Sequence, residues 1–171
     1  VSFIICSVFF FVFFKDKTSN TDAIYQKAFE QNYRVFAPHI PKDLSFMGER
    51  VPLDTFYVRE SLDKELIVNT YFQSNTIATM KRAYRFFPII EPILKQHNIP
   101  DDFKYLAIIE SGFENKVSPA GAAGFWQFMR ATGLSYGLEI NDEIDERYHL
   151  EKATIAACKY LRESYNKFDN W

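Results

Sequence analysis

Cysteine, glycine and histidine are scarce in this chain of 171 residues, which has two, six and three of them. Cys6 lies inside an apolar run and Cys158 is far from it, so we expect no disulfide framework. The histidines are scattered and belong to no HExxH or Cys/His pattern; they are His39, His97 and His149. We therefore expect no metal and no cofactor.

The chain also lacks an excess of positive charge. Its 20 Lys and Arg residues against 22 Asp and Glu residues give a net charge of −2, and they form no basic run. Phosphate backbones are bound by clustered Lys and Arg, so nucleic acid is not an expected partner. With 47% hydrophobic and 25% charged residues, the composition fits a globular chain with one core of moderate size.

One long apolar run stands at the start of the sequence. Residues 1–14 read VSFIICSVFFFVFF, which predicts a signal or anchor segment. The run is shorter than the ~20 residues that span a bilayer as a helix, but it opens at Val instead of Met. No small-x-small cleavage pattern precedes Lys15, which favours a retained membrane anchor over a cleaved signal. We expect the membrane to be a partner through this segment.

The rest of the chain predicts an all-α fold. Residues 15–61 read as a linker and an irregular region that contains one helical pattern, over 21–36, because prolines and a glycine interrupt residues 37–58. Residues 62–171 are expected to form the main domain. Its apolar spacings predict helices over 62–72, 76–87, a further turn opened by Pro88, 100–111 and 151–168. No run alternates convincingly enough to be a strand.

Glu110 is the candidate catalytic residue. Helical geometry places it within one arc of about 100° with three apolar side chains, Phe103, Leu106 and Ala107. Further apolar residues cover most of the helix, so we expect Glu110 to be buried and to hold its proton near neutral pH. A carboxyl of that kind suits general acid catalysis followed by base catalysis. Helix geometry alone favours the alternative, a structural ion pair or a local cap.

A loop rich in small residues follows this helix. Residues 118–129 read SPAGAAGFWQFM, in which glycine and alanine let the backbone approach a bulky ligand. Trp126, Gln127 and Met129 offer stacking, a hydrogen bond and an adaptable apolar contact. The loop by itself is equally compatible with a tight turn between helices that anchors an aromatic residue in the core.

Five ordered motifs together resemble the lytic murein transglycosylases, most closely their membrane-bound type D branch. They are residues 110–113 (ESGF), 118–129, 136–138 (YGL), 145–147 (DER) and 153–161 (ATIAACKYL). The resemblance covers about residues 62–171 and is strongest over 99–161. It implies a lysozyme-like helical fold that cleaves the β-1,4 bond between N-acetylmuramic acid and N-acetylglucosamine in peptidoglycan. It also implies a location on the periplasmic side of the bacterial cell envelope.

The resemblance also implies roles for individual residues. Glu110 would protonate the leaving oxygen and then deprotonate the muramyl 6-hydroxyl, which closes a 1,6-anhydro sugar without a second carboxylate. Ser118, Gln127 and Met129 match positions along the substrate groove, and Gly124 is assigned to the same set. Ser111 is included as well, although support of the helix end suits it better. We expect Asp145 and Arg147 to form a structural ion pair and Glu114, Asp142 and Glu143 to be surface residues.

The sequence departs from the family pattern at three points. Arg130 replaces the usual proline, and Tyr148-His149 replaces the usual Arg-Asp. The chain stops before the family's Ala-Tyr-Asn-Ala-Gly segment, so we expect an incomplete groove and weak or no activity in this form. Two alternatives stay open: a muramidase that uses water in place of the 6-hydroxyl, and a non-catalytic domain that binds the cell wall.

Overall fold

The computed structural model describes residues 22–28, 30–32 and 35–171. The chain divides into two compact units, Val1–Ala37 and Pro38–Trp171. In the first unit, residues 22–28 and 30–32 are helical, as the pattern over 21–36 predicted. The predicted membrane segment, residues 1–14, lies outside the described residues. Among the residues that are described, no helix is both long enough and apolar enough to cross a bilayer.

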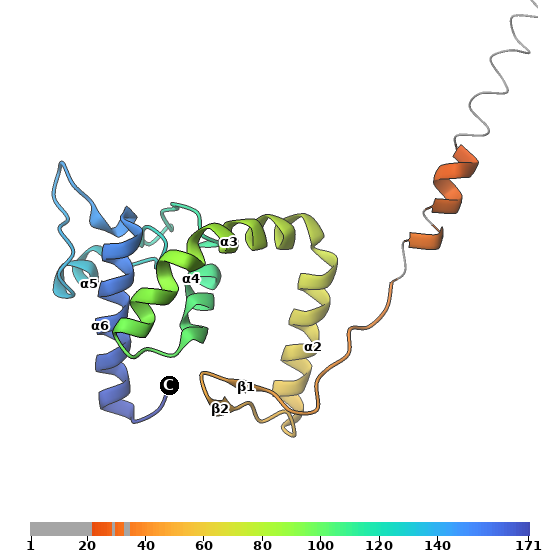
Figure 1. Ribbon diagram of the computed structural model, residues 1–171, viewed down its shortest axis with the longest axis horizontal. Coiled ribbons are helices and arrows are strands. Elements are labelled where there is room, and N and C mark those ends of the chain that lie inside the picture. Colours follow the sequence, from red (N-terminus) through yellow and green to blue (C-terminus); the bar gives the residue numbers. More distant parts are fainter. Residues whose placement is uncertain (1–21, 29, 33–34) are drawn as a thin grey trace, which may run out of the picture. The chain divides into compact units, whose positions relative to one another are not determined.

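The second unit is mostly helical, which confirms the predicted fold class. Figure 1 shows α3 connecting α2 with the part of the chain that α4, α5 and α6 form. In chain order the elements are β1 (Ser45–Phe46), β2 (Glu49–Arg50), α2 (Phe56–Tyr71), α3 (Gln73–Gln96), η1 (Asp101–Phe103), α4 (Lys104–Ser111), α5 (Arg130–Ser135), η2 (Glu146–Tyr148) and α6 (Leu150–Phe168). The domain start expected at residue 62 falls inside α2.

The strands β1 and β2 form a small antiparallel hairpin that the sequence analysis missed. Met47 and Gly48 make its turn with φ angles of 55° and 81°, the left-handed values that tight hairpin turns require. Strands of two residues are too short to show alternation in the sequence. The backbone N–H of Met47 donates to the Asp102 carboxylate at 2.7 Å, and that bond ties the hairpin to η1.

The helix α3 runs unbroken through Pro88 and Pro92, so the prediction of a new turn opened by Pro88 was wrong. Each proline removes one helical hydrogen bond to the carbonyl four residues earlier. Pro88, Pro92 and Tyr84, whose carbonyl loses its partner at Pro88, are all exposed, so water can satisfy the freed groups. The opposite face keeps the helix in place, since Ile90 and Leu94 are fully buried.

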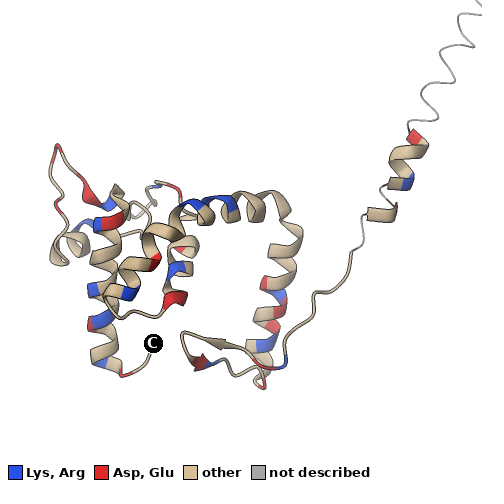
Figure 2. Cartoon of the chain, viewed as in Figure 1, with Lys and Arg blue, Asp and Glu red and all other residues tan. Residues whose placement is uncertain are grey.

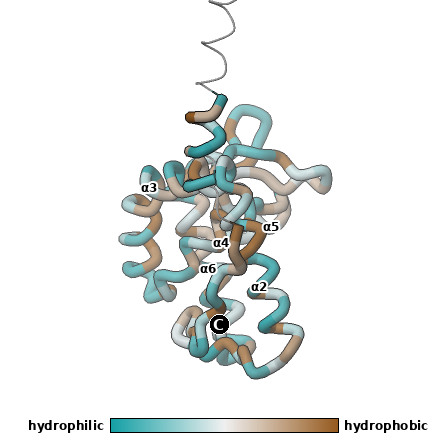
Figure 3. The backbone as a smooth tube through the Cα atoms, turned by 90° about the vertical axis from the view of Figure 1, so that its right-hand side faces the viewer, coloured by the Kyte–Doolittle hydropathy of each residue, from teal (hydrophilic) through white to brown (hydrophobic). Residues whose placement is uncertain are grey.

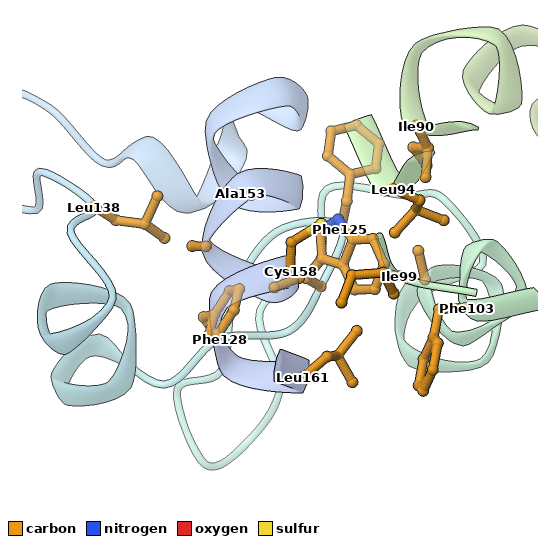
Figure 4. Packing of buried hydrophobic residues seen from close by; sticks show 14 of the residues in the cluster. Ile90, Leu94, Ile99, Phe103, Phe125, Phe128, Leu138, Ala153, Cys158 and Leu161 are labelled. Carbon is orange, nitrogen blue, oxygen red and sulfur yellow. The ribbon is translucent and has the colours of Figure 1, made fainter. Parts of the chain in front are cut away.

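One hydrophobic core joins α3, α4, α6 and the segment 123–140 (Figure 4). The most extensive contact between two elements is that of α3 with α6. The core side chains include Ile90, Leu94, Ile99, Phe103, Ala107, Phe113, Phe125, Trp126, Phe128, Leu138, Ile140, Ala153, Ala156, Ala157, Cys158 and Leu161. Burial raises the pKa of the Cys158 thiol to about 11, so this cysteine acts as a small core residue. Figure 3 shows hydrophobic and hydrophilic residues interspersed along the helices.

Candidate active site

Glu110 lies in the last turn of α4. The helix ends at Gly112, whose φ of 62° is the left-handed C-cap that was predicted there, and its N–H donates to the Ile108 carbonyl. The prediction that Glu110 is buried is wrong, because its side chain is exposed. Ile109 is 75% exposed as well, so α4 buries one face only, through Ala107 and Ser111, with Leu106 partly buried beside them.

Glu110 nevertheless faces a cavity of about 250 Å³. Typical ligand pockets measure about 300–1,000 Å³, so the space suits one sugar ring more than a whole strand. Three predicted site residues meet here, Glu110, Gln127 and Met129. The remaining lining side chains are uncharged: Leu106, Trp126, Phe128, Thr132, Ala157, Tyr160 and Leu161. The cavity therefore combines one carboxylate with a mostly apolar wall.

Gln127 presents an acceptor to this cavity. Its backbone has a φ of 47°, in the left-handed region. Its Nε2 donates to the Gly124 carbonyl at 2.8 Å and to the Lys116 carbonyl at 3.0 Å. Both amide protons are thereby engaged, and the two carbonyl partners fix which atom is nitrogen. Oε1 is the atom that remains to accept a hydrogen bond from a ligand.

Trp126 forms part of the cavity wall, and its ring is anchored in the core. Its indole Nε1 donates to Thr154 Oγ1 at 2.9 Å, and that hydroxyl donates in turn to the Leu150 carbonyl at 2.7 Å. Trp126 is 7% exposed and Thr154 is completely buried. The ring therefore offers an edge or part of a face to a ligand, and α6 fixes its orientation.

Ser111 supports the end of α4, the role that the sequence analysis considered better suited to it, and it lies outside the cavity lining. The side chain is buried, and its Oγ lies 2.9 Å from the Phe125 carbonyl and 3.1 Å from the Ala107 carbonyl. The same oxygen accepts a hydrogen bond from the backbone N–H of Phe113. These contacts join the end of α4 to the loop that carries Trp126 and Gln127.

Ser118 and Gly124 lie outside the cavity lining. Ser118 holds a turn, because its Oγ accepts the Ala122 N–H at 3.0 Å. Gly124 has a φ of 78°, and a Cβ there would come within 1.9 Å of the Arg147 carbonyl oxygen. The close approach that glycine allows at this position is thus to the protein backbone, whereas the sequence analysis expected a ligand.

Comparison with known proteins now identifies the family. Residues 87–171, which include Glu110 and every other residue of the cavity lining, match the family described as Transglycosylase SLT domain. The chain belongs to the SLT-domain transglycosylases. The helical fold and the family agree with the lysozyme-like architecture that the motifs implied.

Two curated relatives extend the match towards the start of the chain. Membrane-bound lytic murein transglycosylase D of Escherichia coli (strain K12) is 30% identical over 129 residues. The protein of the same name in Escherichia coli O6:H1 gives the same figures. Each alignment covers 73% of this chain and 28% of the relative, so the chain spans less than a third of the relatives' length.

The Asp145–Arg147 ion pair predicted from the sequence is confirmed, and it shapes the loop of the SLT domain. The carboxylate accepts from Arg147 Nη2 at 2.6 Å and from Nε at 2.9 Å. Arg147 Nη1 also donates to the carbonyls of Gly121 and Phe128. The hydrogen bonds from Arg147 hold the pKa of Asp145 below its usual value. One guanidinium therefore holds both ends of the segment 121–128.

Sequence reasoning did not assign Tyr160 to the site of the SLT domain. It is 46% exposed in the cavity wall, and its ring packs edge-to-face against Tyr136 at 5.5 Å. The Tyr136 hydroxyl donates to Glu163 at 2.7 Å, which fixes the supporting ring. Tyr160 lies within the motif 153–161, but nothing in that motif indicated that this residue borders a cavity.

Charge is dispersed over the SLT domain and the rest of the described chain. Figure 2 shows Lys and Arg interspersed with Asp and Glu along the helices. Within the described residues, no group of three or more His, Cys, Asp or Glu side chains is placed to hold a metal ion. His149 instead caps the start of α6, where its Nδ1 accepts the Lys152 N–H.

Proposed function

We propose that this protein is a peptidoglycan lytic transglycosylase that cleaves the β-1,4 bond between N-acetylmuramic acid and N-acetylglucosamine. Glu110 is its acid and base, and the product carries 1,6-anhydromuramyl ends. The observation that carries the proposal is the composition of the cavity: Glu110 is the one ionisable carboxyl among its ten lining residues. The glycan strands of peptidoglycan are the substrate, and the bacterial cell envelope, on its periplasmic side, is the place of action.

A single carboxylate favours this reaction over ordinary glycoside hydrolysis. Most glycosidases need two carboxyl groups, one on each side of the scissile bond. Here Glu110 protonates the leaving oxygen, and the carboxylate then removes the proton of the muramyl 6-hydroxyl. The 6-oxygen bonds to the anomeric carbon, so the substrate itself supplies the nucleophile that a second carboxylate or a water would otherwise provide.

Because Glu110 is exposed, the bound substrate has to supply part of the surroundings that shield it from water. A carboxyl in contact with water is solvated, and its interactions are weakened by the high dielectric constant. A sugar ring that fills the cavity displaces this water and leaves Glu110 among the apolar wall, Gln127 and Met129. Gln127 Oε1 is available to accept from a sugar hydroxyl or amide, while Met129, 44% exposed, gives an adaptable apolar contact.

The test compares Glu110→Gln with the parent and with Glu143→Gln, a control that removes an exposed carboxyl outside the cavity. Purified peptidoglycan is digested by the longest natural form of the protein, and mass spectrometry reads the new ends. We expect anhydro ends from the parent and the control and no cleavage by Glu110→Gln. Glycan binding should persist in Glu110→Gln, because the amide keeps the shape of the side chain.

Other results would decide for the alternatives. New ends that are heavier by one water indicate a muramidase. Binding of glycan by all three proteins without cleavage indicates a wall-binding domain. Cleavage by Glu110→Gln at the parental rate shows that the acid is a different residue.

A further inference from the structure

Arg82 of α3 reaches the end of the helix that carries Glu110. Its Nε donates to the Gly112 carbonyl at 2.6 Å, directly after the last residue of α4. Its Nη1 lies 3.1 Å from Glu114 Oε1, and its Nη2 donates to Thr79 Oγ1 at 3.3 Å. Arg82 precedes residues 87–171, the segment that the SLT family model matches.

We propose that Arg82 is a positioning residue for Glu110: by fixing the carbonyl of Gly112 and the carboxylate of Glu114, it keeps the last turn of α4 in the orientation that aims Glu110 at the cavity. This assignment rests on the proposed function of Glu110.

The helix α4 needs such support because it has eight residues. Isolated helices of that length are marginal, and their last carbonyls lack partners within the helix. A cation at the C-terminal end also interacts favourably with the helix dipole. The planar guanidinium binds two acceptors in a fixed relative geometry, which a more flexible ammonium does not.

The orientation of Glu110 depends on its backbone. Within the described part of the chain, its carboxylate has neither a hydrogen bond nor an ion pair to another side chain. Ser111 holds the helix end through the Phe125 carbonyl, and Arg82 holds it through the Gly112 carbonyl. A displacement of about 1 Å in a catalytic group can cost about 100-fold in rate.

Glu114 stays available to Arg82 as an anion. Lys116 and Arg82 both pair with it, and hydrogen bonding from Lys116 is the main cause that holds the pKa of Glu114 below its usual value. Arg82 therefore contacts the Glu114 carboxylate and the Gly112 backbone carbonyl. Its side chain is 24% exposed, so this pairing is partly shielded from water.

The experiment compares Arg82→Gln with Arg85→Gln, which removes an exposed arginine from the same helix. The kcat and KM for soluble glycan fragments are measured with the intact protein and divided by the folded fraction from circular dichroism. For Arg82→Gln we expect kcat to fall about 10- to 100-fold with KM within twofold of the parent. Arg85→Gln should match the parent, and Arg82→Lys should recover part of the loss.

A second measurement reads the helix end directly. Amide hydrogen exchange at residues 110–113 should become faster in Arg82→Gln and stay unchanged in Arg85→Gln. An unchanged kcat per folded molecule, or a loss confined to KM, overturns the assignment even if exchange is faster. If Arg82→Gln does not fold, the same criteria apply to Arg82→Lys. A parent that does not cleave contradicts the proposed function itself, and the positioning role falls with it.

Discussion

Gly124 and Arg147 are packed backbone against backbone, and a β-carbon at position 124 would lie 1.9 Å from the Arg147 carbonyl oxygen and 2.6 Å from its carbonyl carbon. No side chain can move aside to relieve this contact. The loop that carries Gln127 and Met129 is thus seated directly on the segment before α6. The position of one side of the cavity depends on this contact.

Replacement of Gly124 by alanine should destabilise the fold strongly. We expect a loss of at least about 3 kcal/mol in the free energy of unfolding, because the left-handed φ and the steric clash both add to the cost. Gly121→Ala is the matched control, since Gly121 has a φ of 86° and open space around it. It should cost about 1–2 kcal/mol. Urea unfolding measures both, and equal losses would contradict the packing account.

The bond from Trp126 to Thr154 predicts a specific effect in the core. Thr154→Val keeps the shape but leaves the buried indole N–H without its acceptor, which should cost about 1–3 kcal/mol. Thr154→Ser keeps the hydroxyl and should restore most of the difference. Thermal unfolding followed by tryptophan fluorescence compares the variants. A serine variant as unstable as the valine variant would show that the methyl group matters more than the hydrogen bond.

Tyr160 should contribute to glycan binding if the proposed function holds. Loss of its ring in Tyr160→Ala should raise KM about 2- to 10-fold, in line with about 0.5–1.5 kcal/mol for an aromatic contact. Tyr160→Phe keeps the ring and should stay within twofold of the parent. Tyr57→Ala, which removes an exposed tyrosine of α2, is the control. A loss confined to kcat in Tyr160→Ala would contradict a binding role.

The ion pair of Asp145 and Arg147 predicts a pH dependence. The pKa of Asp145 is lowered in the folded state, so its contribution to stability is present above the unfolded value of about 3.9 and is lost as the pH falls through the folded value. The free energy of unfolding should therefore decrease below about pH 4. The pKa of Glu146 is also lowered, chiefly by the hydrogen bond from the Glu139 N–H, so Asp145 accounts for only part of the decrease.

The variant Asp145→Asn isolates that part. At neutral pH it should cost about 1–3 kcal/mol, because Arg147 loses a charged acceptor, and the decrease in stability at acid pH should become smaller. Asp142→Asn removes an exposed carboxylate and should behave as the parent. Urea unfolding at several pH values measures this. If the free energy of unfolding changed with pH in the same way for the parent and Asp145→Asn, the role of the pair would be refuted.

Local signals in the sequence predicted that the long helices exist, but the expected range 62–72 began six residues after the start of α2. Apolar residues at helical spacing predicted α6 to within one residue at its start, and Gly112 marked the end of α4. Pro88 led to a wrong helix boundary in α3. The free-energy cost of a proline inside a helix depends on whether the carbonyls that lose their partners can reach water. Here the burial of Ile90 and Leu94 keeps the helix continuous. The short helix α5 and the hairpin had too few residues for a periodic signal.

The sequence by itself determined the helical periodicity, the family motifs and the choice of Glu110, because these depend on residue type and spacing along the chain. Tertiary structure alone decided that Glu110 is exposed and that Tyr160 borders its cavity. Whether a side chain is buried depends on which other elements pack against it. The sequence of a helix determines which residues share a face. The segments that cover that face are placed by contacts between residues far apart in the chain, such as that of Gly124 with Arg147.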